Sequence, residues 1–351
     1  MSRPLRISRG PVRRRRDTGI VLVVVLFFAL LLATTVATFA RKALVDHMIV
    51  RNRDARAEAE ALARGGVQLA TALILEDALR ASQAESALDH RGEPWAQAAQ
   101  QPMQIAEGVE LRLEIEDAGS RLNLNAAVAF DESGFPQEQS EQLLIALLEK
   151  AIEEIPLPPG ERVYDPLELA SNLIDYIDTD TESLRGGPED TPYQQRTPPA
   201  RPANQPLLSV DELRRVEGFD GLLVDALRPY VTVHPYAGGG GINPNTAPPH
   251  VLALLFFNDG VDLRLAPEDT VREILRVRRD EGLLCEEQAS AEGCTPMTEL
   301  VTNAIFPEPS YSSDVFIVTA RARVGEIERR VEAVIDRRKP SSPQLLSWRI
   351  L

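Results

Sequence analysis

The stretch RRRRDTG (residues 13–19), IVLVVVLFFALLLATTVATFA (20–40) and RKA (41–43) decides how this chain folds. The 21 residues from 20 to 40 carry no charge. A helix of that length rises roughly 30 Å, at about 1.5 Å per residue, which is enough to cross the hydrocarbon core of a bilayer. Seven arginines and one aspartate precede it, and a basic flank stays on the cytoplasmic side. We therefore expect one transmembrane helix, with everything after Arg41 outside the cytoplasm.

Three interpretations of this stretch differ at Gly19. A secretory signal peptide usually has an apolar region of about 7–15 residues and then a small-residue cleavage site, whereas this run is longer and is followed by Arg41 and Lys42. A plain signal anchor agrees with the hydropathy. The third interpretation is a prepilin-type leader, in which residues 1–19 end in a glycine directly before an apolar helix. Cleavage would then fall between Gly19 and Ile20, and the apolar segment would remain.

Composition restricts the partners and the compartment of the chain. The formal net charge is −15, of which residues 1–19 contribute +6, so residues 20–351 carry −21. A surface this acidic repels phosphate backbones and argues against a nucleic-acid partner. The length of 351 residues allows two or three domains. Cys285 and Cys294 lie downstream of the apolar run, where an oxidising compartment would let them form a disulfide, although two free thiols are the alternative.

The apolar run continues into further helical sequence. Residues 41–80 contain no proline and are rich in alanine, leucine, glutamate and arginine, a composition that favours helix. Joined to the membrane segment they make one helix of about 60 residues, on the order of 90 Å long. Its outer half needs something to pack against. Residues 81–107 are polar, contain Pro94 and Pro102, and are expected to form a loop.

Two regions alternate apolar and charged side chains, as half-buried strands do. VELRLEIED (109–117) is one of them, and DVFIVTARARV with EIERRVEAVID (314–336) predicts a hairpin about Gly325. A lone hairpin is marginally stable in water, so we expect these strands to join in one small antiparallel sheet that the long helix covers. Residues 340–351 are expected to form a loose tail.

Helical segments dominate the sequence between the strands. EQLLIALLEKAI (141–152) and DPLELASNLIDYID (165–178) each have one apolar face. LLSVDELRRVEGFDGLLVDALRPYVTV (207–233) predicts a helix–turn–helix pair, in which Ser209 and Glu212 match a capping box. INPNTAPPHVLALLFF predicts an asparagine-capped helix.

The expected fold class is therefore α+β. Residues 81–125 and 307–339 form a head of helix and antiparallel sheet, and residues 126–306 form an inserted α-helical domain.

Several segments of the chain, taken together and in their order along the sequence, resemble the K-type minor pseudopilin of type II secretion. Besides the glycine at the leader junction and the terminal hairpin, they are ARAEAEALARGGVQLA, EDAGSRLNLNA, NLIDYIDTDTESLRGGPEDTPY, NQPLLSVDELRRVEGF and INPNTAPPHVLALL. The resemblance implies a pseudopilin fold, with the long N-terminal helix packed on the sheet. It also implies a structural role at the tip of the pseudopilus, which supports export of folded proteins from the periplasm, and no enzymatic activity.

The resemblance further implies partners and a location. The partners would be the I-type and J-type minor pseudopilins, the major pseudopilin, and a prepilin peptidase that cleaves after Gly19 and leaves an N-methylated Ile20. The chain would be a single-pass inner-membrane protein with its C-terminal domain in the periplasm. We expect the companion minor pseudopilins to bind along residues 41–80, where apolar helix surface is available.

Val24 departs from the pattern of most pilins and pseudopilins, which carry a glutamate at the fifth position of the mature chain. A carboxylate inside a bilayer is costly unless a partner neutralises it, and in the family that partner is another subunit's N-terminal amine. The K-type family resembles this chain in lacking the glutamate, which implies a subunit at the tip. The alternative is that Val24 merely extends an apolar helix.

One acidic segment has the residue types of a calcium site. Six carboxylates occur within 16 residues, next to Gly186 and Gly187, and could supply hard oxygen ligands: Asp175, Asp178, Asp180, Glu182, Glu189 and Asp190. The spacing is not that of an EF-hand, and the alternative is a solvated acidic loop. The resemblance implies calcium, because the K-type family binds calcium in its helical domain. The ligands would be Asp178, Asp180, Glu189 and Asp190.

Two other functions compete with this one. A membrane-anchored helix–hairpin–helix DNA-binding protein is suggested by SVDELRRVEGF and INPNTAPPHVLALL, but the hairpin from Gly218 to Gly221 is one residue longer than usual, and Asp220 would face the phosphates. An enzyme is the other. The four histidines show no metal-ligand spacing, and neither a phosphate-binding loop nor a GxSxG motif occurs.

Overall fold

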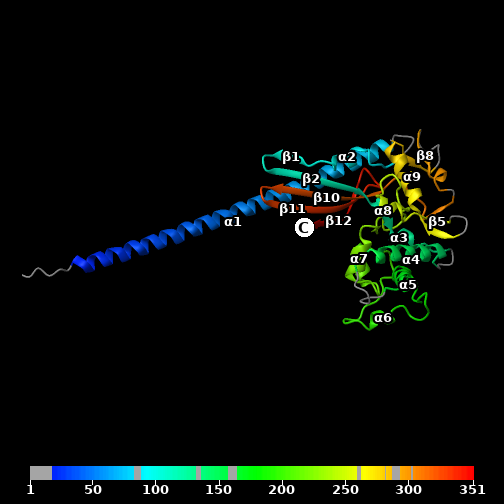
Figure 1. Cartoon of the computed structure of the whole chain (residues 1–351), viewed down its shortest axis with the longest axis horizontal. Coiled ribbons are helices and arrows are strands. Elements are labelled where there is room, and N and C mark those ends of the chain that lie inside the picture. The colour runs from blue at the N-terminus through cyan, green and yellow to red at the C-terminus, as the bar shows by residue number, and fades with distance from the viewer. Residues whose placement is uncertain are drawn as a thin grey trace, which may run out of the picture. The chain divides into compact units, whose positions relative to one another are not determined.

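The structure is a computed structural model, and Figure 1 shows its helices and strands. It describes residues 18–82, 88–131, 136–156, 164–258, 262–280, 282–286, 293–301 and 303–351. The chain divides into two compact units, residues 1–58 and 59–351, and each is described by itself. Helix α1 (Thr18–Ala81) contributes residues to both. Most of the expected leader, residues 1–17, lies outside the described residues.

In the first unit, α1 exposes its apolar side chains. Every residue from Ile20 to Val50 is exposed. In the described part of the chain, Ile20–Ala81 is the one helix that is long and apolar enough to cross a membrane by length and composition. The hydroxyl groups of Thr34, Thr35 and Thr38 donate hydrogen bonds to carbonyls three or four residues earlier. The polar groups of this segment are thus satisfied within the helix, as a bilayer requires.

The second unit contains a five-stranded antiparallel sheet with the order β1-β2-β10-β11-β12. Its strands are β1 (Met103–Ala106), β2 (Val109–Asp117), β10 (Val315–Val324), β11 (Ile327–Asp336) and β12 (Gln344–Ile350). The predicted strand at 109–117 and the predicted hairpin are confirmed, and Gly325 turns the hairpin with φ +59°. Their predicted union is also confirmed, because β2 pairs with β10 from Asp117 opposite Phe316 to Val109 opposite Val324.

The part of α1 in this unit packs on one face of the sheet through small side chains. Ala59, Ala63 and Ala70 have no exposed surface, and Ala63, Ala70 and Ile74 share a core with the apolar residues of β2, β10 and β11. A β-carbon added at Gly66 would lie 2.9 Å from the side chain of Leu111. Helix and sheet are therefore close enough to exclude any larger side chain at that position.

Two expectations about irregular segments were wrong. The expected loop at 81–107 contains the short helix α2 (Pro94–Ala98) and strand β1. The expected loose tail, residues 340–351, contains β12, which pairs with β11. The tail was missed because Leu346 is an extra residue in the ladder, between the Leu345–Ile335 and Ser347–Val334 pairs. Such a bulge interrupts the alternation that identifies a strand.

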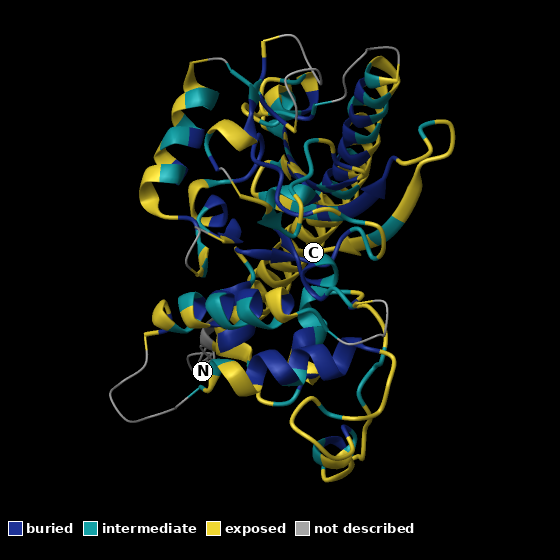
Figure 2. Cartoon of the chain, turned by 90° about the vertical axis from the view of Figure 1, so that its right-hand side faces the viewer, coloured by how far each residue is buried: buried dark blue, intermediate teal, exposed yellow. Residues whose placement is uncertain are grey.

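The part of the chain between β2 and β10 forms a second hydrophobic core, whose members come from residues 122–301. Its larger helices carry their apolar residues inward, and Figure 2 shows helices that are dark blue on one part and yellow on another, as amphipathic helices should be. The elements of this region are η1 (Ala118–Ser120), β3 (Leu122–Asn123), α3 (Leu124–Ala127), α4 (Glu138–Glu153), α5 (Pro166–Ile177), α6 (Thr191–Gln194), η2 (Val210–Arg215), α7 (Gly221–Leu227), β4 (Val231–Thr232), α8 (Pro249–Leu252), β5 (Phe256–Asn258), β6 (Leu263–Leu265), α9 (Glu268–Arg279), β7 (Leu284–Cys285), β8 (Thr295–Pro296), η3 (Met297–Glu299) and β9 (Ile305–Phe306).

The inserted region contains more short strands than expected. Strands β3 and β4 pair, β5 pairs with β6 and β9, and β7 pairs with β8. The first helix of the predicted helix–turn–helix pair is the 3-10 helix η2, and the side chain of Ser209 makes no capping bond. Glu212 still reaches back, because its carboxylate accepts a hydrogen bond from the backbone N–H of Leu208, 2.9 Å away. The second helix, α7, is capped by Asp220.

The predicted asparagine-capped helix is also different. Helix α8 has four residues and begins after Pro248. Asn243 and Asn245, before it, are buried and bond other segments instead. The amide of Asn243 donates to the carboxylate of Asp117 at the end of β2, at 3.0 Å. These asparagines therefore join the inserted region to itself and to the sheet.

A buried polar network joins the end of α1 to the sheet. The guanidinium of Arg337, just after β11, donates to the carboxylates of Asp77 in α1 (2.7 Å) and of Asp89 (2.6 Å). All three side chains are at least nine-tenths buried. Arg337 also lies over the ring of Phe316. A buried charge must be paired and hydrogen-bonded, so this network fixes the three segments against one another.

Candidate metal centre

Helix α5 places two carboxylates on one side of its C-terminal end. Pro166 occupies its first turn, and the side chain of Asp165 accepts hydrogen bonds from the N–H groups of Leu167 and Glu168, so the start of the helix is capped. Asp175 lies in its last turn, and Asp178 is the C-cap residue. Residues three apart in a helix are neighbours on its surface, so the two carboxylates approach each other.

The chain after α5 turns back and brings a third carboxylate to the same place. Glu182 and Pro188 form an isolated antiparallel bridge. Gly186 and Gly187 lie between them with φ of +87° and +92°, a backbone conformation that favours glycine. Glu189 directly follows Pro188, and its side chain is buried.

Asp175, Asp178 and Glu189 form the acidic cluster. One carboxylate oxygen from each lies within 4.8 Å of the others, and all three residues are buried. Asp175 accepts a hydrogen bond from the N–H of Leu184 at 3.0 Å, and Glu189 accepts one from the amide of Asn204 at 3.3 Å. One buried oxygen of Asp178 and one of Glu189 have no hydrogen-bond partner within the described chain.

Burial and mutual repulsion raise the proton affinity of this cluster. Burial raises the pKa of Glu189 to about 8, and the charges of Asp178 and Asp175 add to the effect. Burial also raises the pKa of Asp178 to about 6, with a further contribution from Asp180. The pKa of Asp175 is raised by burial as well. Among the described residues, no arginine or lysine forms an ion pair with any of the three. Such a cluster binds either protons or a cation.

The arrangement fits a hard cation. Carboxylate oxygens are the ligands that Ca²⁺ prefers, and two buried oxygens without partners are available to it. Of the four expected ligands, Asp178 and Glu189 lie in the cluster. Asp180 is exposed and accepts a hydrogen bond from the N–H of Glu182, and Asp190 precedes α6. Asp175 was in the acidic segment but not among the expected ligands; its three-residue spacing from Asp178 was the signal for it.

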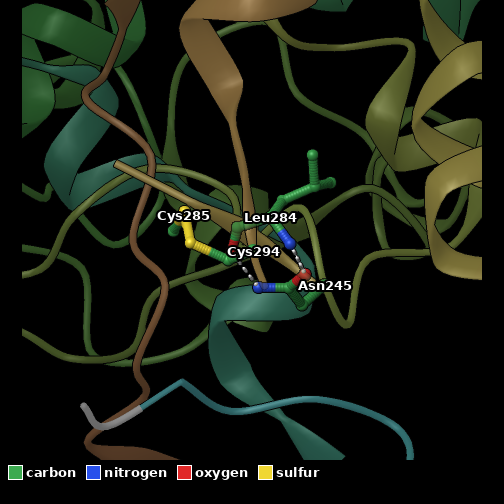
Figure 3. Close-up of a disulfide and its surroundings, with 4 residues drawn as sticks. All are labelled: Asn245, Leu284, Cys285 and Cys294. Atoms are coloured by element: carbon green, nitrogen blue, oxygen red, sulfur yellow. Dashed lines mark hydrogen bonds between the residues drawn. A yellow bond between two sulfur atoms is a disulfide. The ribbon is translucent and has the colours of Figure 1, made fainter. Parts of the chain in front are cut away.

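Cys285 and Cys294 are joined by a disulfide, with their α-carbons 5.9 Å apart. The bond links β7 to the segment before β8, and the two strands pair in parallel. Figure 3 shows Asn245 beside it, where the amide side chain both accepts from and donates to the backbone of Leu284, each at 2.8 Å. The disulfide and Asn245 thus hold the same strand.

The residues singled out at the N-terminus all lie in α1. Gly19 and Ile20 belong to its first turn, and the side chain of Val24 is 45% exposed. The run from Ile20 to Ala40 carries no charge, and every residue from Ile20 to Val50 is exposed. The helix is therefore continuous through the expected cleavage point.

The hairpin from Gly218 to Gly221, considered for DNA binding, makes contacts within the chain itself. Gly218 has φ +84°, and a β-carbon there would lie 2.8 Å from the side chain of Leu169 in α5. The carboxylate of Asp220 caps α7 by accepting from the N–H of Leu223, and it also accepts from the hydroxyl of Tyr164. The start of α7 thus already holds an anionic group, and a phosphate there would be repelled.

Comparisons with known proteins agree on one family. Residues 120–236 match the model of type II secretion system (T2SS), protein K. The chain is 30% identical over 227 residues to a putative type II secretion system protein K from Escherichia coli K12, covering 62% of this chain and 64% of the relative. It is 27% identical over 280 residues to type II secretion system protein K from Klebsiella pneumoniae, covering 80% of each. The chain thus spans slightly less than two thirds of the Escherichia coli relative.

A solved structure has the same fold. It is the GspK-GspI-GspJ complex from the type 2 secretion system of enterotoxigenic Escherichia coli, and one of its chains matches with a TM-score of 0.59 and 21% sequence identity. The match covers 86% of the present chain and 99% of the other. The α+β arrangement of a long N-terminal helix and an antiparallel sheet is therefore shared.

Proposed function

We propose that this chain is a minor pseudopilin of the protein K type at the tip of the pseudopilus, where it supports export of folded proteins from the periplasm. Its similarity to type II secretion system protein K, in a family model over residues 120–236 and in relatives 27–30% identical, supports this proposal. Its role is structural rather than catalytic. The observation that carries this proposal is the shared fold with a chain of a GspK-GspI-GspJ complex. The I-type and J-type minor pseudopilins are the proposed partners, together with the major pseudopilin below them.

Position 24 supports a place at the tip. Val24 stands where a glutamate would otherwise pair with the N-terminal amine of a neighbouring subunit within the membrane. Without that carboxylate, the chain has no charge to neutralise inside the bilayer. A subunit of this kind ends a filament more readily than it extends one.

The exposed outer part of the apolar helix is the proposed binding surface. Leu44, Val45, Met48 and Ile49 are each about half exposed or more and lie on one face of α1, at helical spacing. A soluble helix rarely exposes such a stripe without a partner. Of the expected range 41–80, the later part includes Ala63, Ala70 and Ile74, which are buried in the core with the sheet. The helices of the companion minor pseudopilins are therefore the proposed partners along residues 41–58.

The proposed route to the membrane includes removal of the leader. A prepilin peptidase would cleave between Gly19 and Ile20 on the cytoplasmic side, and the new N-terminus would be methylated. The apolar helix would hold the protein in the inner membrane, with residues 59–351 in the periplasm. N-terminal sequencing of the protein isolated from membranes tests this. A start at Ile20 supports the proposal, whereas a start near Arg41 indicates a signal peptide and an intact leader indicates a plain anchor.

We also propose that the acidic cluster binds calcium. Asp175, Asp178 and Glu189 would be the ligands, and a bound Ca²⁺ would supply the positive charge that no arginine or lysine of the described residues brings to these carboxylates. Isothermal titration of the full chain with CaCl₂ should show binding that is lost in Asp178→Ala. The matched control Glu182→Ala, in the same loop but exposed, should bind as the unchanged chain does. Equal binding by both variants would place the site elsewhere.

A further inference from the structure

The outer edge of β12 offers unpaired main-chain groups. In the order of the sheet β12 comes last, next to β11 (Figure 1). Arg330 and Leu351 exchange backbone hydrogen bonds, at 3.3 and 2.8 Å. In an antiparallel ladder such pairs alternate with pairs that do not bond. The N–H and C=O groups of Trp348 and Ile350, opposite Ala333 and Val331, therefore point away from β11.

The side chains at the same two positions are apolar and exposed. Trp348 is 37% exposed and Ile350 45%. Their partners across the ladder, Ala333 and Val331, belong to the core under α1, and cross-strand partners share a face. Trp348 and Ile350 therefore extend the apolar face of the sheet beyond the part that is buried.

The two edges of the sheet differ in how they resist strand pairing. Strand β1 has four residues, begins directly after Pro102, and has an irregular register between Gln104 and Ala106. These are features that protect an edge. The bulge of β12 lies at Leu346, before Trp348, so the residues after it are regularly paired with β11. An apolar, regular edge without such protection is a template for another strand.

We infer that the outer edge of β12 pairs with a β-strand of a companion pseudopilin subunit, and this inference rests on the proposed function. The incoming strand would be amphipathic. On one face its apolar side chains would lie beside Trp348 and Ile350. On the other face an acidic side chain would lie beside Arg349, which is the only charged residue of β12.

Charge disfavours a second copy of this chain as the occupant. Antiparallel pairing of two β12 strands about Trp348 would place the two Arg349 side chains diagonally across the new ladder, and β12 carries no acidic residue to separate them. Arg349 forms an ion pair with Asp211 at 3.6 Å, and Arg228 engages the same carboxylate more closely, at 2.7 Å. A strand that brings its own carboxylate avoids this repulsion.

Hydrogen exchange in the complex tests the inference directly. The full chain in detergent would be mixed with purified I-type and J-type subunits, and amide exchange would be measured by mass spectrometry for residues 344–351, with and without them. We expect the amides of Trp348 and Ile350 to exchange at least tenfold more slowly in the complex. Formation of the complex with no change at these amides would overturn the inference and leave the proposed function intact.

Ile350→Pro provides a second measurement. It removes an N–H that β11 does not use, and proline is tolerated at such edge positions. Loss of this one main-chain hydrogen bond should weaken assembly about tenfold, whereas the control Ile350→Val should leave it within about twofold. Equal affinity of both variants would contradict the inference. Failure of the unchanged chain to bind either companion would overturn the proposed function as well. Protection that appears in the isolated chain and grows with its concentration would identify a second copy as the occupant and also overturn the inference.

Discussion

Arg337 is a single buried cation on which three segments converge. Its guanidinium binds Asp77 of α1 and Asp89, and its backbone follows β11. Removing one partner from such a group leaves uncompensated charge in the interior. The cost is far greater than that of losing an exposed ion pair.

We therefore expect Arg337→Met to lower the free energy of unfolding by about 3–5 kcal/mol. The control is Arg323→Met. The side chain of Arg323 is 57% exposed and pairs with Glu110 in β2, so its loss should change stability by less than about 1 kcal/mol. Chemical denaturation of the full chain in detergent, followed by circular dichroism, measures both. Equal effects would show that the network carries no special stability.

The acidic cluster predicts a pH dependence whose direction depends on calcium. In the presence of a chelator, the folded chain binds more protons than the unfolded chain between pH 4.5 and about 8, because the pKa of Glu189 is raised from 4.5 to about 8. Stability contributed by this group therefore falls as the pH rises through that range. Calcium binds the deprotonated cluster, so its stabilising effect grows with pH.

The melting temperature of the full chain, measured from pH 5 to 8 with calcium and with chelator, checks this. The difference between the two curves should widen with pH. In Glu189→Gln it should be small and nearly independent of pH, whereas the exposed control Glu182→Gln should behave as the unchanged chain. A difference that shrinks as the pH rises would exclude calcium binding by these carboxylates.

At the scale of the element, α1 has room for a larger side chain at Gly65 but not at the neighbouring Gly66, which faces the sheet. A β-carbon at Gly66 would meet Leu111 at 2.9 Å and Leu113 at 3.0 Å, whereas one at Gly65 would meet nothing within 4 Å. A substitution at Gly66 therefore tests the packing of the helix on the sheet, whereas a substitution at Gly65 tests helix propensity alone.

We expect Gly65→Ala to raise the free energy of unfolding by about 0.5–1 kcal/mol, because alanine is the better helix former. Gly66→Val should lower it by about 1–3 kcal/mol, because the added atoms overpack the contact between helix and sheet. Thermal denaturation of the full chain in detergent measures both. A Gly66→Val protein as stable as the unchanged chain would mean that the helix does not lie this close to β2.

Sequence patterns predict a strand well where one of its faces is buried and the other exposed, because apolar and polar residues then alternate without interruption. VELRLEIED alternates without interruption, and strand β2 has the predicted bounds. QLLSWRI does not alternate, because a bulge at Leu346 places two leucines side by side, so β12 could not be predicted. The asparagines near 243 look like helix caps in the sequence; only the folded chain shows that Asp117 and Leu284 are their partners.

The candidate site was partly predictable for the same reason. Clustering of acidic residues in the sequence identified the segment and two members of the cluster, Asp178 and Glu189. It could not separate these two from Asp180 and Asp190, which are not members of the cluster, because which side chains point inward depends on how the loop returns from Gly187 to α5. Asp175 lies among apolar helix residues, where a carboxylate is unexpected unless something binds it.

At the scale of the whole molecule, the binding surface proposed on α1, formed by Leu44, Val45, Met48 and Ile49, predicts which substitutions prevent assembly. Met48→Asp adds a charge to the exposed apolar stripe of α1, 56% exposed at that position, and should weaken binding to the I-type and J-type subunits at least tenfold. Asn52→Asp adds the same charge one turn later at a residue that is already polar, and should have little effect. Co-purification of the subunits with each variant measures this. An unchanged yield with Met48→Asp would move the docking surface elsewhere.

The register between β2 and β10 has a consequence for how the protein is built. Asp117 at the end of β2 lies opposite Phe316 at the start of β10, so residues 118–314 leave the sheet and return to it at one point. Closing a flexible loop costs only about 0.6 kcal/mol more for each doubling of its length, and a region that folds by itself holds its own ends together. The insertion is therefore thermodynamically inexpensive, but it delays folding. When the chain emerges N-terminus first, α1, β1 and β2 are made before β10, and β2 cannot pair with β10 until the whole inserted region has followed.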